Sequence, residues 1–492
     1  MAKANGGEMA ATLGRHGFTT LAGVASKERD AAVAEIVARI AEAELEVIRI
    51  SFVDIHGYLR SRPIEARHFA QAARNGVPFT TALFAMDSAN LIYLPIFNRD
   101  GGMGNLAMGG GGDMLAVPDV TTFRLLPWAD KTGWVLCDLH LTTGERCPFD
   151  PRLIMQQACG ALAARSLAFL AGVEVECHVL SIDDPHLALA DCTQPPRPPA
   201  VSALSHGYQH MSELRVDELE RVIMPIRRAL LALGLPLRTV EGEWGPGQIE
   251  ITLDPLTGVA AADAVVLMRA AVKQVTRRMG LIASFMTKPA LPNVFSSGWH
   301  LHQSLADAAG GNAFVSPTEL MSDIGLHYTG GLLKHVRAAT AFSNPTINGY
   351  KRLNANPLAP KRAVWANDNK GAMCRLVGGP GDPGTHIENR SGEPLANPYL
   401  YMASQIVAGL DGIETAEHPG EPLDDDPYSQ VDRPLLPSSL MDAIDALDSS
   451  QLFRAEFGDA FVSHYVGMKR QEIGRFYSHV TDWEHREYFE AY

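Results

Sequence analysis

Apolar and polar residues alternate along the stretch AGVEVECHVL, residues 171–180. A period of two predicts a β-strand, in which residues two apart point to the same face. Glu174 and Glu176 would then share one face, while Val173 and Val175 share the other. Two carboxylates held together in a half-buried place repel each other unless something positive lies between them. The alternation therefore predicts a strand and a binding site for a positively charged group.

Other segments repeat their apolar residues every three or four positions and consist of good helix formers, which predicts amphipathic helices. The helices are expected at about residues 29–44, 147–166 (after an initial turn), 217–234, 261–280, 326–342 and 464–477. Further strands are expected at about residues 45–54, 133–141 and 249–253.

Glycine and proline mark the breaks between these elements. Residues 1–28 are rich in small residues and are interpreted as a flexible N-terminal arm. The glycine-rich stretch at 100–113 has no Lys-Ser or Lys-Thr after its glycines, so a mobile loop is favoured over a P-loop. A turn near residue 146 is the expected boundary between an N-terminal domain, 29–145, and a larger domain, 146–492.

Composition narrows the class of protein. A chain of 492 residues with 46% apolar residues can bury a sizeable core. Its net charge of -14 argues against nucleic-acid binding. The six cysteines form no close pairs, so neither a disulfide framework nor a zinc ribbon is indicated. No apolar run reaches the roughly 18 residues needed to span a bilayer, and we expect a cytoplasmic protein without a membrane partner.

More acids and histidines recur two apart or around tight turns. Glu243 and Glu250 flank a Gly-Pro-Gly turn that can bring them together, and His300 and His302 would share one strand face. Taken singly, paired strand glutamates are usually a solvated edge, and His-x-His is more often not a metal site. Their recurrence favours a metal centre, and the excess of carboxylates over imidazoles suits Mg²⁺ or Mn²⁺ better than zinc.

Cations gather in one region of the chain. Arg352, Lys370, Arg375 and Arg390 lie within some forty residues, and Glu388 precedes Arg390 by two. An isolated Glu-x-Arg pair is nearly always a surface ion pair. Beside carboxylate metal ligands, however, an arginine and lysine cluster indicates phosphoryl transfer, in which cations clamp the developing charge.

Six ordered motifs over about residues 45–490 resemble the glutamine synthetase family, of the long bacterial type. They read FVDIHGYLRSR, GVEVE, EWGPGQIE, SGWHLHQSL, INGYKRLN followed by LAP, and ENRSGEPLANPYLY. The resemblance implies an α+β fold, with a small β-grasp-like N-terminal domain and a large catalytic domain built on a curved antiparallel sheet. It also implies ATP and two or more Mg²⁺ or Mn²⁺ ions per active site.

By the same resemblance, each residue of the motifs has an expected role. One metal ion would be bound by Glu176, Glu243 and Glu250, and the second by Glu174, His300 and Glu388. The nucleotide phosphates would contact His302, Ser304, Lys370, Arg375 and His386. The glutamate substrate would be bound by Arg352, Arg390, Ser296 and Gly298, with Arg352, Lys370 and Arg375 also acting on the transferring phosphoryl group.

Several departures from the family pattern concern substrate binding. Lys370 and His386 stand where arginines are usual, which keeps a cation at Lys370 but loses the forked guanidinium. Phe295 and Ser296 change the stretch before the first histidine. Most important, Leu358 replaces the flap glutamate, and Thr80 replaces an N-terminal aspartate, in a loose alignment. These two acids would bind ammonium and help remove its proton.

Loss of both acids favours a bulkier, apolar amine, and an aryl amine is already neutral at pH 7. The sequence therefore predicts a γ-glutamyl-amine ligase for a hydrophobic or aromatic amine, resembling γ-glutamylanilide synthetases. Ligation of aliphatic mono- or polyamines, glutamine formation from ammonia, and a non-catalytic assembly role remain alternatives. The family also implies a homo-oligomer, a dodecamer with active sites between subunits.

Overall fold

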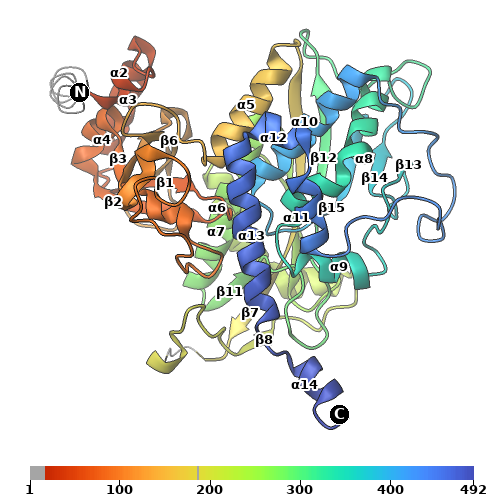
Figure 1. The fold of residues 1–492 in the computed structure, drawn as a ribbon. Helices are drawn as coiled ribbons and strands as arrows, with labels where there is room; N and C mark the ends of the chain where they lie inside the picture. Colours follow the sequence, from red (N-terminus) through yellow and green to blue (C-terminus); the bar gives the residue numbers. More distant parts are fainter. Residues whose placement is uncertain (1–16, 185–187, 492) are drawn as a thin grey trace.

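The computed structural model describes residues 17–184 and 188–491. It consists of two bodies side by side, a smaller one made by the first third of the chain and a larger one made by the rest (Figure 1). Within the described ranges, the smaller body contains a six-stranded sheet and the larger a nine-stranded sheet. The α+β class, with a small N-terminal domain before a larger catalytic-type domain, is confirmed.

The N-terminal sheet has the strand order β2-β1-β6-β4-β3, with β5 paired to β6. Its strands β1 and β6 are parallel and its other pairs are antiparallel. The predicted helix at 29–44 and strands at 45–54 and 133–141 are present. The elements are α2 (Phe18–Leu21), α3 (Lys27–Glu42), β1 (Val47–Val53), β2 (Leu59–Glu65), α4 (Phe69–Asn75), β3 (Val77–Thr80), β4 (Asp113–Pro118), β5 (Arg124–Leu125) and β6 (Thr132–Leu141).

The expected N-terminal arm falls partly outside the described residues, which begin at residue 17. In its described part, Phe18 is 2% exposed and its ring lies edge-on to His140, with 6.1 Å between the ring centroids, whereas residues 25–28 are exposed. The glycine-rich stretch contains a short 3-10 helix, Leu106–Gly111. Asn105 starts this helix by accepting a hydrogen bond from the Ala107 amide.

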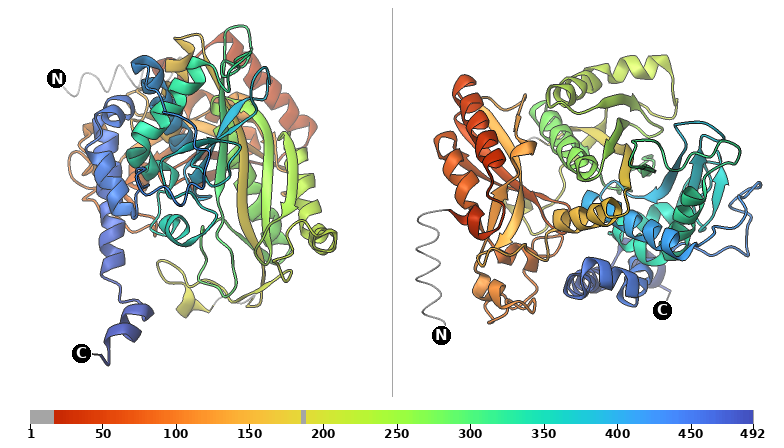
Figure 2. Two further views of the ribbon diagram at one scale, coloured as in Figure 1. Left: turned by 90° about the vertical axis from the view of Figure 1, so that its right-hand side faces the viewer. Right: turned by 90° about the horizontal axis from the view of Figure 1, so that it is seen from above.

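The larger sheet has the order β13-β14-β15-β12-β7-β10-β9, with β8 and β11 also paired to β7. All its pairs are antiparallel except β13 with β14. Figure 2 shows its long strands curving together. The strands are β7 (Ala168–Ile182), β8 (Val201–Ala203), β9 (Leu237–Gly242), β10 (Gln248–Thr257), β11 (Leu281–Ser284), β12 (Trp299–Ala306), β13 (Trp365–Asn367), β14 (Cys374–Val377) and β15 (His386–Gly392).

Helices cover this sheet and confirm the helical predictions for this part of the chain. Helix α7 packs on β7, β10 and β11, with α6 beside it, while α8 packs on β15 and along α10. None of the helices in the described ranges is long and apolar enough to cross a membrane. The helices in the part of the chain after residue 150 are α5 (Pro151–Ala163), α6 (Glu213–Ala232), α7 (Val259–Arg278), α8 (Asp323–Ser343), α9 (Gly349–Ala355), α10 (Pro398–Thr415), α11 (Leu440–Asp448), α12 (Gln451–Phe457), α13 (Asp459–Tyr477) and α14 (Asp482–Tyr488).

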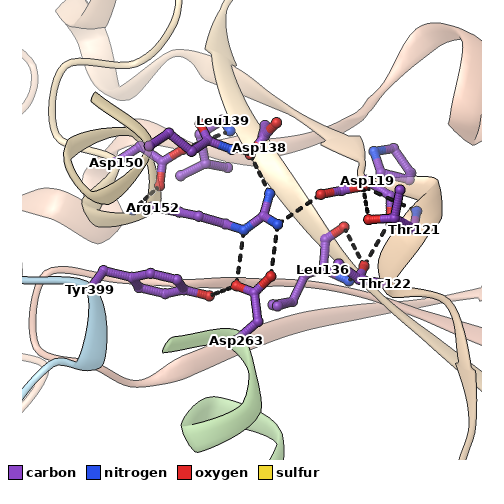
Figure 3. Close-up of polar contacts among 12 residues, drawn as sticks. Asp119, Thr121, Thr122, Leu136, Asp138, Leu139, Asp150, Arg152, Asp263 and Tyr399 are labelled. Atoms are coloured by element: carbon purple, nitrogen blue, oxygen red, sulfur yellow. Dashed lines mark hydrogen bonds and ion pairs between the residues drawn. The ribbon is translucent and has the colours of Figure 1, made fainter. Parts of the chain in front are cut away.

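A buried arginine joins the two bodies (Figure 3). Arg152, on α5, donates to Asp138 and Asp119 of the N-terminal body, at 2.7 Å each. It also donates to both oxygens of Asp263 on α7, at 3.1 and 2.8 Å, and the Tyr399 hydroxyl donates to Asp263 at 2.6 Å. We call these five residues the Arg152 network.

A second contact between the two bodies involves the sequence motif FVDIHGYLRSR. Arg60 donates to Asp54 at 2.7 Å, and the side chain of Asn397 donates to the Asp54 carbonyl at 2.9 Å. Gly57 has a φ of 84°, and a Cβ there would come within 3.3 Å of the Asn397 Cα. The motif therefore needs glycine because the turn packs directly against the start of α10.

Candidate active site

The register of four neighbouring strands aligns most of the expected metal ligands. Strand β7 carries Glu174 and Glu176 on its less buried face, while Val173 and Val175 are buried on the other, as the alternation predicts. Residues opposite each other in an antiparallel pair are close neighbours. The opposing pairs are Glu176 with Glu250 on β10, Glu174 with His300 on β12, and His302 with Glu388 on β15.

The side chains of these residues form a compact cluster. Glu174 is in hydrogen-bond contact with His300 Nδ1 and lies 3.2 Å from His302 Nε2. His300 Nδ1 is also 3.6 Å from a Glu388 oxygen. Among the described residues, two groups have ligand atoms within 4.8 Å of one another: Glu174 with Glu250 and His300, and Glu174 with His302 and Glu388.

The turn between β9 and β10 adds Glu243. The Glu243 amide donates to the Gln248 carbonyl at 2.9 Å, which closes the turn two residues before Glu250. Gln248 in turn donates to Glu176 at 2.8 Å. The expected ligands thus come from one continuous stretch of sheet and its connecting turn.

Electrostatics shows that the cluster lacks counter-charge on one side. Burial, with repulsion from Glu243, raises the pKa of Glu176 to about 8. Burial and the neighbouring Glu174 likewise raise the pKa of Glu250. On the other side, hydrogen bonds from His300 and His302 overcome the effect of burial and lower the pKa of Glu174. A cation among these carboxylates would favour their ionised forms.

This donor set of carboxylates with one or two imidazoles fits Mg²⁺ or Mn²⁺. The two groups of ligand atoms differ from the two expected ligand sets, because the structure places His302 as well as His300 beside Glu174. The pairing of β12 with β15 produces this difference, since it sets His302 opposite Glu388. The assignment of individual ligands to individual ions stays a prediction.

The cluster opens into a cavity of about 510 Å³, which we call the cleft. Its lining comes from six strands, from helix α9 and from several loops. Such a concave site with converging polar groups is the usual location of ligand binding. The expected site residues that line it are Glu174, Glu176, Glu243, Glu250, His300, Glu388, Ser296, Arg352, Leu358, Lys370, Arg375 and Arg390.

The arginines are held rigidly at the wall of the cleft. Arg352 is 3% exposed and donates to the carbonyl oxygens of Arg390 and Ser391, at 3.0 and 3.3 Å. A Cβ on Gly298 would come within 2.7 Å of the Arg352 guanidinium, so only glycine fits against it. Arg375 donates to Glu388 at 3.0 Å.

Five expected site residues are not part of the cavity lining, and one of them is Gly298, which packs against Arg352 as described above. His302 and His386 contact each other, 2.9 Å between ring nitrogens, and Ser304 is buried further along β12. Thr80 ends β3 in the N-terminal body, where its hydroxyl donates to the Gly111 carbonyl at 2.9 Å. Within one chain, Thr80 does not line the cleft.

Four aromatic residues line the cleft that the sequence did not predict as site residues, although Phe295 is a departure from the family pattern. Trp244 and Phe295 line the cleft, together with His210 and Tyr428. Trp244 follows Glu243 directly, and Phe295 precedes Ser296, so their place beside two motif residues was the available signal. His210 and Tyr428 come from loops whose sequences carry no comparable signal.

A family model described as the catalytic domain of glutamine synthetase matches residues 148–488. The chain belongs to the glutamine synthetase family. The matched range includes the whole nine-stranded sheet and every residue of the cleft named above. The larger body is thus the catalytic domain of a glutamine synthetase-type enzyme.

Known members of this family extend the comparison over nearly the whole chain. Gamma-glutamylanilide synthase from Acinetobacter sp is 42% identical over 486 residues, covering 94% of this chain and 96% of that protein. Glutamate–isopropylamine ligase from Pseudomonas sp is 30% identical over 473 residues, covering 94% and 99%. The solved structure of a GmaS/ADP complex superposes with a TM-score of 0.78 at 31% identity, covering 92% of this chain and 99% of that one.

Proposed function

We propose that the protein is an ATP-dependent ligase that joins the γ-carboxylate of glutamate to an amine through γ-glutamyl phosphate. The observation that carries this proposal is the single cavity in which the carboxylate cluster faces Arg352, Arg375, Arg390 and Lys370. Family membership and relatives that are named glutamate–amine ligases support it. Because ATP is the energy source, we place the reaction in the cytoplasm.

The residues of the cleft have separate tasks. Arg352 and Arg390 bind the carboxylates of glutamate, and Gly298 leaves the Arg352 guanidinium uncovered by a side chain. Arg375 and Lys370 face the transferring phosphoryl group and neutralise its charge, while His302, Ser304 and His386 contribute to the nucleotide side. Two Mg²⁺ or Mn²⁺ ions, when bound to the glutamates and His300, supply further positive charge next to the phosphates.

The amine is hydrophobic or aromatic. Leu358 lies at the cleft and is 50% exposed, so an apolar side chain faces the place where an amine must enter. Leu358 itself offers no carboxylate with which an ammonium ion could pair. The 42% identity with gamma-glutamylanilide synthase supports the same substrate class.

A panel of amines tests this proposal, with ATP, Mg²⁺ and glutamate present and phosphate release as the readout. We expect aniline-like amines to give higher kcat/KM than ammonium, methylamine or polyamines. Preference for ammonium would identify a glutamine synthetase, preference for an aliphatic amine a different ligase, and no turnover with any amine a non-catalytic homologue.

Leu358→Glu tests the pocket itself. A buried carboxylate beside an apolar ligand costs several kcal/mol when it has no partner. The variant should therefore lose efficiency with aniline and gain weak activity with ammonium, which pairs with the new charge. Leu358→Met, which keeps an apolar side chain of similar size, is the control and should behave like the wild type. Equal loss with both amines would show that Leu358 only packs in the flap.

We further propose a large cyclic homo-oligomer, a dodecamer, in which the N-terminal domain of one subunit closes the cleft of the next. The position of Thr80 supports this, because it is exposed on the N-terminal body and can reach a cleft only in another copy. Light scattering at working concentration tests the assembly, and a monomeric mass would contradict it.

A further inference from the structure

Three aromatic rings form a continuous row along the cleft. The His210 and Trp244 rings are stacked, with centroids 5.2 Å apart and planes inclined by only 7°. The Phe295 ring lies 6.2 Å from the Trp244 ring, inclined by 31°. All three residues line the cleft beside the carboxylate cluster. We call them the aromatic row.

The backbone holds the row in place. The Trp244 carbonyl accepts a hydrogen bond of 2.6 Å from the Tyr208 amide, and the Trp244 amide donates to Glu243 at 3.0 Å. A Cβ on Gly245 would lie only 3.1 Å from the Phe295 amide nitrogen, so the two loops are packed backbone to backbone. These contacts place the backbone of Trp244 and Phe295 beside Glu243.

The row is also open on the cleft side. Trp244 is 39% exposed although it lies in a cavity, so part of its ring surface still faces solvent. Exposed aromatic surface inside a concave site gains free energy when a ligand covers it. A ligand ring parallel to Trp244 gains stacking in addition, about 0.5–1.5 kcal/mol beyond the buried area.

We infer that the aromatic row is the surface on which the ring of the amine stacks, and that Trp244 selects aromatic over saturated amines. The inference rests on the proposed function and adds the recognition element to it. Because the row adjoins Glu243, a ring on Trp244 places its amino nitrogen towards the carboxylate cluster. Leu358, on the flap, bounds the same cleft with an apolar side chain.

The test compares two amines of the same size, aniline and cyclohexylamine, with hydroxylamine as a nucleophile too small to use the row. Trp244→Leu should lower kcat/KM for aniline about tenfold and leave cyclohexylamine within about threefold. Activity with hydroxylamine should fall much less than activity with aniline, because hydroxylamine has no ring to stack on the row. Trp244→Phe keeps a ring and should recover most of the aniline activity.

The outcomes separate the inference from the proposed function. A wild type that is inactive with every amine, hydroxylamine included, overturns both. If Trp244→Leu keeps normal hydroxylamine activity but loses activity with aniline and cyclohexylamine equally, only the stacking role is overturned. The stacking role is also overturned if the variant keeps the wild-type preference for aniline. If Trp244→Leu melts at a lower temperature and also loses hydroxylamine activity, the row is structural and the inference fails.

Discussion

The Arg152 network and the carboxylate cluster of the cleft both gather acidic side chains in a buried place, but they neutralise them differently. In the network, Arg152 lies among Asp119, Asp138 and Asp263. Although burial opposes it, the ion pair with Arg152 keeps the pKa of Asp119 below its ordinary value. In the cleft, burial and mutual repulsion raise the pKa of Glu176.

The difference separates a structural charge cluster from a functional one. The network contains its counter-ion as a side chain, so it is complete as soon as the chain folds. Among the described residues, Glu176 and Glu250 of the cleft have no ion-pair partner, so burial and repulsion favour their protonated forms until a cation from outside binds. Buried carboxylates that are paired with a cationic side chain of the same protein therefore indicate a structural contact between domains. Buried carboxylates without such a partner indicate a binding site for a cation.

Removing ligands from the cleft should have the largest effect. Glu176→Ala and His300→Ala are each expected to lower kcat by at least ~10²-fold, because the phosphoryl group loses the charge that a correctly placed ion supplies. Both variants should keep their fold and bind Mn²⁺ more weakly in calorimetry. Glu145→Gln, which changes an exposed carboxylate outside the cleft, is the matched control. Full activity in either alanine variant would contradict the ligand assignment.

Removing the internal counter-ion should affect stability instead. Arg152→Met leaves the carboxylates of the network without their cation, and breaking such a buried pair costs about 3–5 kcal/mol. Urea denaturation should show this loss with or without Mg²⁺. Arg165→Met removes an exposed arginine paired with Glu414, and should cost less than about 1 kcal/mol. Equal denaturation midpoints for the two variants would show that the network does not hold the two bodies together.

Mg²⁺ should raise the free energy of unfolding by binding in the cleft and not elsewhere on the protein. Mg²⁺ at 100 times its dissociation constant adds about 2.7 kcal/mol to the free energy of unfolding. Differential scanning calorimetry should show a higher melting temperature with Mg²⁺, reversed by chelation. Arg152→Met should gain as much as the wild type, and His300→Ala less. A gain that His300→Ala shares fully would place the stabilising ion elsewhere.

Glu393 is a buried carboxyl that belongs to neither the Arg152 network nor the cleft, and its expected effect on stability is smaller. In the described part of the chain it forms no ion pair, and its carboxyl accepts from the hydroxyls of Thr287 and Thr346 at 2.6 and 2.8 Å. Burial raises its pKa from 4.5 to about 7, although the hydrogen bonds from Thr287 and Thr346 and the charge of Lys469 oppose the shift. The folded state thus keeps a proton that the unfolded state releases.

This contribution to stability is complete below pH 4.5 and is lost as the pH rises through about 7. The loss should be on the order of 2 kcal/mol between pH 5 and pH 8. Glu393→Gln cannot ionise, so its free energy of unfolding should depend less on pH than that of the wild type. Denaturation series at several pH values measure the difference, and parallel curves would refute the assignment.

The ligand strands could be predicted from sequence because the information is local. Alternation identified β7, and the Gly-Pro-Gly turn identified the approach of Glu243 to Glu250. The Arg152 network could not be predicted, because its members are brought together from both bodies by tertiary packing. The aromatic row could not be predicted for a related reason. Helix α6 and strand β9 separate His210 from Trp244 along the chain, and no periodicity marks either ring.

The shared register of β7, β10, β12 and β15 also bears on how the chain avoids misfolding. Sliding β7 by one residue against its neighbours would turn Glu174 and Glu176 into the hydrophobic core and bring Val173 and Val175 to the surface. Burying unpaired carboxylates is far more costly than losing one ladder hydrogen bond. The glutamates needed for chemistry thus also make a shifted alignment of β7 unfavourable, so they help to specify the correct register of the sheet.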